Sequence, residues 1–286
     1  MAYGVLALTL LIWSFSFYGA RVVMGALTVP EALAARFVPV LIGCLLLLAL
    51  RRPNLRALTR GDWLRLAAMG ALSVPLYNLF FFAAMRRVPS GTAALIIALN
   101  PAFTALLASF FLGETFGARR LLGLVSGLAG VFVILQAGGQ LATPGEVRDA
   151  LLLVLAPLCW AGYTVIGRAW QPPISRFDAT LLLLTLGSAP MIIGLRGGLP
   201  GRLAAQPAVL AWALYLGLFC TLFGFAAWLW ALGRLPAGKV AAFVFLNPPL
   251  AALWAAWLEG LRPDGTWLLG AALVLVGMAL ILFGRK

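Results

Sequence analysis

The stretch RRVPSGTAALIIALNP, residues 86–101, decides the fold because a variant of it, GRLPAGKVAAFVFLNP, occupies residues 233–248. The two copies start 147 residues apart. The same spacing relates other prominent residues along the chain: Trp13 and Trp160, Arg21 and Arg168, Gly123 and Gly270, Gly130 and Gly277. Matches spread over the whole chain indicate an internal duplication rather than one recurring motif. We therefore expect two repeats, over residues 1–140 and 141–286.

Composition indicates that both repeats lie in a membrane. The chain is 63% hydrophobic and only 10% charged, which is too little polar surface for a soluble protein of 286 residues. An α-helix needs about 20 mostly apolar residues to cross the hydrocarbon layer. The sequence provides ten such stretches, expected near residues 4–23, 32–50, 63–84, 91–112, 117–137, 149–168, 178–196, 208–231, 238–258 and 265–284.

Each repeat is thus expected to hold five helices, and the odd number determines how the repeats are related. After five crossings the chain is on the opposite side of the membrane, so the second repeat is inserted upside down relative to the first. Inverted repeats of this kind build many transporters, with the substrate site near the bilayer midplane where the repeats meet. We expect an all-α membrane protein, a monomer, with ten transmembrane helices around a central cavity.

The basic residues predict the orientation. If the N-terminus is inside, thirteen of the 21 Lys and Arg residues fall at cytoplasmic helix ends and eight at the opposite ends. Cytoplasmic loops carry such an excess, so we expect both termini in the cytoplasm and the protein in an inner membrane. The net charge of +13 is spread singly or in pairs over helix ends. This distribution fits lipid headgroups and argues against nucleic acid as a partner. No removable signal peptide is expected.

Catalytic and cofactor chemistry has little support in the sequence. The three cysteines lie in different apolar stretches without CxxC spacing, and the chain has no histidine. Neither a disulfide framework nor a metal site is therefore expected. No GxxxxGK[ST] or HExxH motif occurs, and the eight acidic residues fall in loops or near helix ends. We expect no enzymatic activity and no cofactor. A membrane-embedded enzyme and a structural subunit are the alternatives from other classes.

Three stretches carry a resemblance to a known family: LLIWSFSFYGAR at residues 10–21, RVPSGTAALIIALNPAFTALLASFFLGE at 87–114, and LLGLVSGLAGVFVI at 121–134. With its repeats, nearly the whole chain resembles the EamA family, the ten-helix branch of the drug/metabolite transporter superfamily. The resemblance implies export of amino acids or related metabolites through a central cavity, as in an aromatic amino-acid exporter of that family. The family's GE pair is present as Gly113 and Glu114, but the second repeat has Gly260 and Leu261.

Two Asn-Pro pairs are expected near the bilayer centre. Asn100 and Asn247 lie about ten residues into their apolar stretches, and each is followed by a proline. Pro101 and Pro248 lack a backbone donor and bend a helix, so we expect them to act as hinges. The asparagine amides either line a shared cavity or bond a neighbouring helix, and both interpretations stay open.

Aromatic and polar side chains complete the expected cavity. Tryptophan normally collects at membrane interfaces, whereas Trp13 and Trp160 fall near the bilayer centre. They are expected either to stack on an apolar substrate or to pack in the core. Polar groups in membrane helices tend to face the bundle interior. On this ground the other expected substrate-binding residues are Ser16, Tyr77, Asn78, Tyr163, Trp228 and Lys239. The alternative for Lys239 is snorkelling to the interface.

The expected cavity holds no charge near its centre, and this property predicts both cargo and mechanism. No acid or histidine falls in the middle of an expected span, so a group for proton coupling is missing and gradient-driven transport is favoured. The small-molecule cargo is expected to be neutral or zwitterionic, most of all an aromatic or hydrophobic amino acid. Drugs or nucleotide sugars are the alternative within the same architecture.

Overall fold

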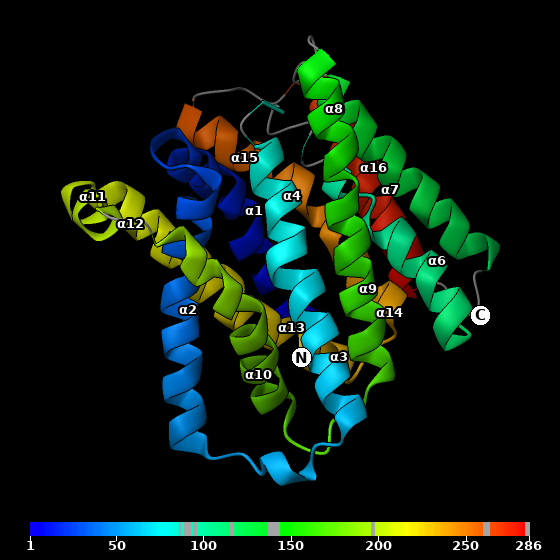
Figure 1. Ribbon diagram of the computed structural model, residues 1–286. Helices are drawn as coiled ribbons and strands as arrows, with labels where there is room; N and C mark the ends of the chain where they lie inside the picture. Colours follow the sequence, from blue (N-terminus) through cyan, green and yellow to red (C-terminus); the bar gives the residue numbers. More distant parts are fainter. Residues whose placement is uncertain are drawn as a thin grey trace.

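The computed structural model describes residues 1–85, 87–88, 93, 96–114, 117–136, 144–195, 198–259 and 264–283. Within these ranges the chain folds into helices and connecting turns, without a strand (Figure 1). Seven helical segments of the described residues are long and apolar enough to cross a membrane: Ala2–Ala26, Val29–Arg51, Arg60–Ala84, Arg148–Ala169, Arg176–Gly194, Pro207–Leu232 and Gly265–Phe283. A shorter apolar helix covers Asn100–Leu112.

The helices are named in chain order. Those of the first half are α1 (Ala2–Ala26), α2 (Val29–Arg51), the short η1 (Leu55–Ala57), α3 (Arg60–Ala71), η2 (Leu72–Leu76), α4 (Tyr77–Ala84), α6 (Asn100–Leu112) and α7 (Ala118–Gln136). Those of the second half are α8 (Pro144–Leu153), α9 (Leu155–Ala169), α10 (Arg176–Ser188), η3 (Ala189–Gly194), α11 (Leu199–Ala205), α12 (Pro207–Leu214), η4 (Tyr215–Phe223), α13 (Gly224–Leu232), α14 (Ala237–Ala242), η5 (Phe243–Leu246), α15 (Asn247–Glu259) and α16 (Gly265–Phe283).

Three helices begin at a hydroxyl residue followed three positions later by an acid. In each pair the hydroxyl and the carboxylate hydrogen-bond to each other, and one or both also accept a backbone N–H of the first turn. Such caps satisfy donors that a helix start leaves open. The pairs are Thr28 with Glu31 at α2, Thr59 with Asp62 at α3, and Ser175 with Asp178 at α10.

Most of the expected stretches overlap described helices, and the main differences lie around the two Asn-Pro pairs. Residues 238–258, expected as one bent helix, instead form α14, the 3-10 segment η5 and α15. Pro248 explains the interruption, because it has no N–H to donate and its ring crowds the carbonyl four residues earlier. α6 likewise begins at Asn100, directly after a turn. The preceding part of the expected stretch 91–112 lies partly outside the described residues.

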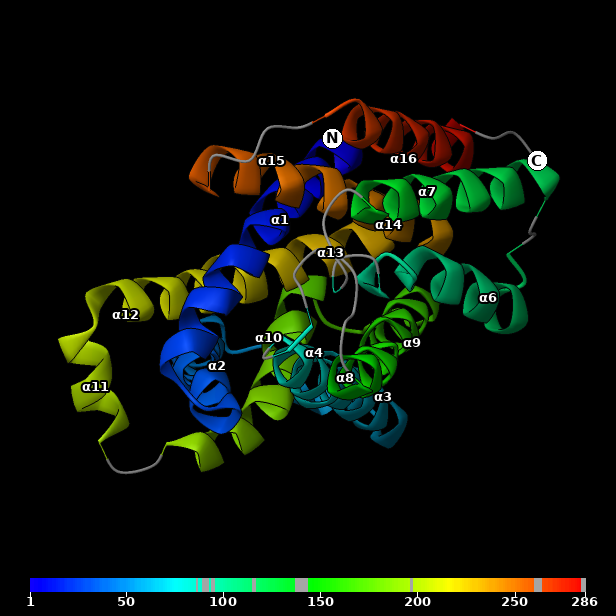
Figure 2. The same cartoon turned by 90° about the horizontal axis from the view of Figure 1, so that it is seen from above.

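α7 and α16 lie side by side and cross at glycines (Figures 1 and 2). A Cβ added to Gly123 would lie 2.7 Å from the carbonyl oxygen of Gly277, and one added to Gly130 would lie 2.5 Å from that of Gly270. Small residues allow such close backbone approach between membrane helices. Since Gly270 and Gly277 follow Gly123 and Gly130 by 147 positions, the two helices present equivalent residues to each other.

We expect Gly277→Ala to destabilise the protein by about 1–3 kcal/mol, the usual cost of overpacking. A Cβ there would lie 2.5 Å from both the oxygen of Gly123 and the nitrogen of Gly127, and these backbone atoms have little freedom to move. Gly43→Ala is the matched control, because a Cβ at Gly43 meets nothing within 4 Å. Thermal unfolding of the purified protein measures both variants. Equal melting temperatures would contradict this packing.

A second pair of close contacts is also made at equivalent positions. A Cβ added to Gly70 would lie 2.6 Å from the oxygen of Leu183, which brings α3 against α10. A Cβ added to Gly217 would lie 2.5 Å from the oxygen of Arg36, which brings η4 against α2. Gly217 follows Gly70, and Leu183 follows Arg36, by 147 residues. The same helix contact is therefore made twice, each time between residues of different halves.

The outer surface of the bundle is apolar along its length and ionic toward its ends. Large side chains such as Phe110, Phe111 and Trp257 are about three-quarters exposed. Ion pairs join helix ends: Arg51 with Asp178 at 2.5 Å, Arg87 with Asp149 at 3.1 Å, and Arg202 with Glu31. An extended apolar surface bounded by charges suits a lipid environment.

Candidate functional site

A cavity with about 650 Å³ of empty space, its open mouth included, is lined by residues of both halves. Its aromatic lining residues are Trp13, Phe17, Tyr77, Phe81, Trp160 and Phe225. Its polar lining residues are Ser16, Arg36, Asn78, Asn100, Cys220 and Asn247. The cavity thus combines a wide aromatic wall with a few polar groups.

Two tryptophans at equivalent positions meet in the cavity wall. The rings of Trp13 and Trp160 pack edge to face, with centroids 5.2 Å apart. Behind them, Trp228 packs against both at 5.4 and 5.7 Å. A Cβ added to Gly224 would collide with the indole of Trp13, so the glycine leaves the space that this ring occupies. Aromatic packing of this kind holds both rings in fixed orientations.

Two π-helical segments, η2 and η4, stand behind the wall at overlapping repeat positions. A π-helical turn disturbs the regular backbone hydrogen bonding and is common at functional sites. In η4, the carbonyl of Cys220 accepts from Trp13 Nε1 of α1 at 2.7 Å. In η2, the equivalent carbonyl is that of Ser73, which accepts from Asn78 Nδ2 at 3.3 Å. Trp160 Nε1 is buried and has no hydrogen-bond partner among the described residues.

Arg36 brings a charge into the cavity. This residue of α2 is 8% exposed, and its guanidinium donates to Thr221 Oγ1 and to Asn78 Oδ1, both at 3.1 Å. No carboxylate in the described part of the chain lies within 4.0 Å of it. The expectation of a cavity without a buried charge therefore does not hold. The sequence signal was a lone arginine five residues past Glu31 in an apolar stretch, but nothing in that stretch indicates which way it faces.

The two asparagines of the Asn-Pro pairs both line the cavity but differ in their bonding. Asn100 Nδ2 donates to the carbonyl of Pro157 on α9 at 3.3 Å, and its Oδ1 accepts from Thr104 at 3.4 Å. Asn100 thus ties α6 to a neighbouring helix. Asn247 is 5% exposed, and its Oδ1 has no partner among the described residues. A buried acceptor without a partner is costly, so Asn247 differs from Asn100 in having hydrogen-bonding capacity unused by the described residues.

The structure places three expected site residues outside the lining of this cavity. Tyr163 and Trp228 are fully buried behind it. The ring of Tyr163 packs on Trp160, and Trp228 Nε1 donates to Thr164 Oγ1 at 3.1 Å. Lys239 lies half-buried in the first turn of α14. The helix faces that carry Tyr163, Trp228 and Lys239 thus point away from this cavity.

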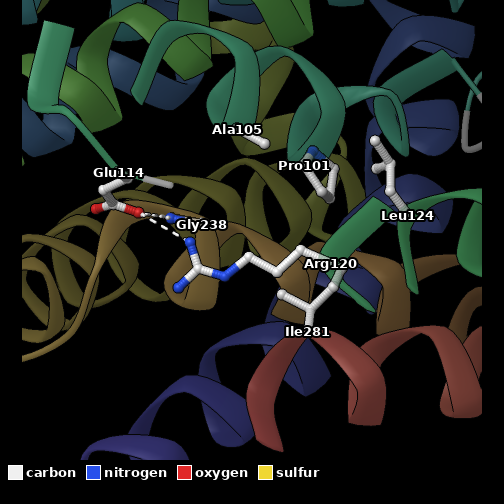
Figure 3. A pocket seen from close by; sticks show the side chains of 7 residues that line it. All are labelled: Pro101, Ala105, Glu114, Arg120, Leu124, Gly238 and Ile281. Atoms are coloured by element: carbon white, nitrogen blue, oxygen red, sulfur yellow. Dashed lines mark hydrogen bonds and ion pairs between the residues drawn. The ribbon is translucent and has the colours of Figure 1, made fainter. Parts of the chain in front are cut away.

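Pro101 lines a smaller cavity with about 350 Å³ of empty space, shown in Figure 3. There the carboxylate of Glu114, just after α6, accepts from the backbone nitrogens of Ala237 and Gly238 at 2.9 and 3.4 Å. Arg120 approaches the same carboxylate at 3.9 Å. Glu114 therefore caps the start of α14 and connects the ends of the two interrupted helices.

We expect Glu114→Gln to destabilise the protein by about 1 kcal/mol, because a charged acceptor at a helix start interacts with both the open N–H groups and the helix dipole. Arg119→Gln is the control, since Arg119 lies exposed in the first turn of α7, close in sequence to Glu114. Thermal unfolding at low salt measures the difference. A variant as stable as the control would mean that this cap contributes nothing.

The chain was compared with known proteins. A model of the EamA-like transporter family matches residues 1–136 and 148–283. A probable terminal-alkyne amino-acid exporter of Streptantibioticus cattleyicolor is 30% identical over 96% of this chain and 91% of the relative. The uncharacterized inner membrane transporter YedA of Escherichia coli is 26% identical over 99% of this chain and 91% of its own length.

A solved crystal structure shares the fold, with a TM-score of 0.71 at 23% identity, covering 96% of this chain and 94% of that chain. The resemblance to the EamA family is confirmed by the family match over nearly the whole chain. Several apolar helices long enough to span a bilayer agree with it. The chain belongs to the EamA-like transporter family of the drug/metabolite transporter superfamily and is a multi-pass membrane transporter.

Proposed function

We propose that this transporter exports small zwitterionic metabolites, chiefly hydrophobic and aromatic amino acids. The aromatic wall of the cavity carries the proposal, because the rings around Trp13 and Trp160 offer an apolar side chain a large, preformed surface. Polar groups in the same cavity suit the charged end of an amino acid. The relative from Streptantibioticus cattleyicolor, named as a probable exporter of an amino acid, supports this class of cargo.

The proposed architecture is ten transmembrane helices in two inverted repeats, with the boundary near residue 140. The glycine crossings of α7 with α16 support it, since each helix presents to the other the residues expected of a two-fold pair. The doubled contact at Gly70 and Gly217 supports it as well. In this arrangement both termini lie in the cytoplasm and the protein in the inner membrane, as a monomer.

The proposed mechanism is alternating access, in which the two repeats rock around the cavity. Interrupted helices give such a movement places to bend, and both interruptions precede a proline, Pro101 or Pro248. Asn100 and Asn247 sit at these interruptions and line the cavity. Bending there would change the cavity and its access together.

We expect transport to be independent of a pH gradient. None of the residues described as lining the cavity is an Asp, Glu or His. A proton-coupled carrier needs an ionisable group in its pathway. Initial uptake rates into liposomes with and without an imposed gradient test this point, and a gradient-dependent rate would overturn it.

Reconstitution of the purified protein in liposomes tests the proposed function. Labelled L-phenylalanine, L-tryptophan and L-leucine are offered beside L-glutamate and a nucleotide sugar. The proposal predicts saturable uptake of the three apolar amino acids and little of the other two. Uptake of no amino acid above that of empty liposomes would overturn the cargo. Preferential uptake of the nucleotide sugar would support the alternative within the same architecture.

A further inference from the structure

We propose that Arg36 binds the carboxylate of the cargo and thereby makes a carboxylate a requirement for recognition. The inference rests on the proposed function of the cavity and names the chemical group of the cargo that the cavity recognises. It follows from the hydrogen bonding of Arg36, from two other buried polar atoms in the same cavity, and from the difference between the two halves of the chain.

The guanidinium of Arg36 is buried with a charge that its neighbours do not balance. A guanidinium has five N–H donors, and the described residues accept from two of its nitrogens only, Nε and Nη1. The acceptors are the neutral oxygens of Thr221 and Asn78, which orient the group without neutralising it. A buried charge without a counter-charge is costly. Because Arg36 lines the cavity, an anionic guest can supply the counter-charge and accept from the donors that remain.

Two aromatic rings lie close to the guanidinium of Arg36. Its central carbon lies 5.0 Å from the ring centroid of Phe37 and 5.9 Å from that of Phe82, within the range of cation–π attraction. Rings on one side and two oriented hydrogen bonds on another leave the group little freedom. A planar guanidinium held in this way is organised in advance for a bidentate contact with a carboxylate.

Two further polar atoms in the cavity wall have no partner among the described residues. Asn247 Oδ1 is a buried acceptor, and Trp160 Nε1 is a buried donor. Both residues line the same cavity as Arg36. An ammonium group can donate to Asn247, and a carboxylate oxygen can accept from Trp160. The unpaired groups of the wall are thus a cation, an acceptor and a donor, which together match a zwitterionic amino acid.

The charged site occurs once, although the chain is duplicated. The position equivalent to Arg36 is Leu183, and the position equivalent to Asn78 is Phe225. The second half therefore has no cation at the equivalent position, so the cargo takes one orientation, with its carboxylate toward α2. A single guanidinium also suits one negative charge better than the two of a phosphate monoester. We therefore assign the site to a carboxylate.

Competition against labelled L-phenylalanine in liposomes tests the carboxylate site. The competitors are 3-phenylpropionate, which lacks the amine, phenylalaninamide and phenethylamine, which lack the carboxylate, and the aminophosphonate analogue of phenylalanine. In the wild type we expect phenylalanine to compete at least about tenfold better than its amide and the amine, since losing one partner of a buried charged contact is costly. Competition by the amide equal to that of the acid would overturn the proposal. Stronger competition by the phosphonate would replace the carboxylate by a phosphate-type anion.

Variants separate recognition from a structural role of Arg36. We expect Arg36→Gln to lose the preference for the acid over the amide and to leave the affinity for the amide unchanged, whereas Arg36→Lys keeps part of the preference. Arg202→Gln is the matched control, because Arg202 pairs with Glu31 outside the cavity. Equal weakening of acid and amide in Arg36→Gln would show a structural role only and overturn the proposal. If Arg36→Gln does not fold, the proposal is tested by the wild-type ratio of acid to amide competition and by the same ratio in Arg36→Lys.

The two proposals fail in different ways. Transport that does not depend on a carboxylate would exclude the proposed role of Arg36. The cavity would then carry an amine or a neutral cargo. Absence of any amino-acid transport would remove the proposed function itself.

Discussion

Replacement of Gly224 by alanine is expected to reduce transport at least about tenfold, because misplacing a binding group by even 1 Å has effects of this size. The new Cβ would collide with the indole of Trp13 and force the ring away from Cys220, to which it now donates. The aromatic wall would then lose its shape on one side. Initial uptake rates in liposomes measure the effect.

Gly25→Ala is the control for this substitution, because Gly25 lies on α1 with Trp13 and a Cβ there meets nothing within 4 Å. The control should transport like the wild type. Melting temperatures of both variants show whether the protein remains folded. A Gly224→Ala variant that is folded and transports at the wild-type rate would contradict the role given to Trp13.

Phenylalanine substitutions at the two equivalent tryptophans, Trp13 and Trp160, are expected to differ in their effects on stability and on amino-acid binding. Trp13→Phe leaves the carbonyl of Cys220 without its donor and should destabilise the protein by about 1–3 kcal/mol. Both substitutions leave space in the aromatic packing, but Trp160→Phe breaks no hydrogen bond within the described residues and should therefore destabilise the protein less. Because the proposed site has Trp160 Nε1 donate to the cargo, Trp160→Phe should also weaken amino-acid binding several-fold.

Thermal unfolding and equilibrium binding of labelled L-phenylalanine measure the two substitutions. Each variant is the control for the other, since both lose the same atoms at equivalent positions. Equal loss of stability in both would contradict the difference in bonding, and unchanged binding in Trp160→Phe would remove that indole from the site.

The sequence allows the position of a residue along its helix to be predicted, but not the direction of its side chain. The 147-residue spacing and the length of the apolar stretches place Trp13, Trp160, Asn100 and Asn247 near one level, and all four line the cavity. Direction could not be predicted in the same way. A helix that is apolar on all sides has no polar face to indicate which side is buried.

Particular residues illustrate this limit. Tyr77 and Tyr163 both looked like cavity residues by depth, yet Tyr77 lines the cavity and Tyr163 packs behind Trp160. Arg36 was visible as an isolated cation in an apolar stretch, but its burial depends on Asn78 and Thr221, which are 42 and 185 residues away. Long-range partners of this kind cannot be read from local sequence.

The backbone irregularities also differ in how far the local sequence predicts them. Proline predicts an interruption at Pro248, because the missing N–H is a local property. The π-helical segment η2 likewise contains a proline, Pro75, whereas η4 has none. In η4 the carbonyl of Cys220 accepts from Trp13, which is 207 residues away in the sequence, so this contact has no local signal.

A structure determined with 4-bromo-L-phenylalanine tests the central claim most directly. The claim is that an apolar amino acid binds in the cavity, with its ring against Trp13 and Trp160 and its carboxylate at Arg36. Anomalous scattering locates the bromine without interpretation of weak density. The account predicts one bromine peak inside the aromatic part of the cavity. A bromine at another place, or none while the same compound is transported, would contradict it.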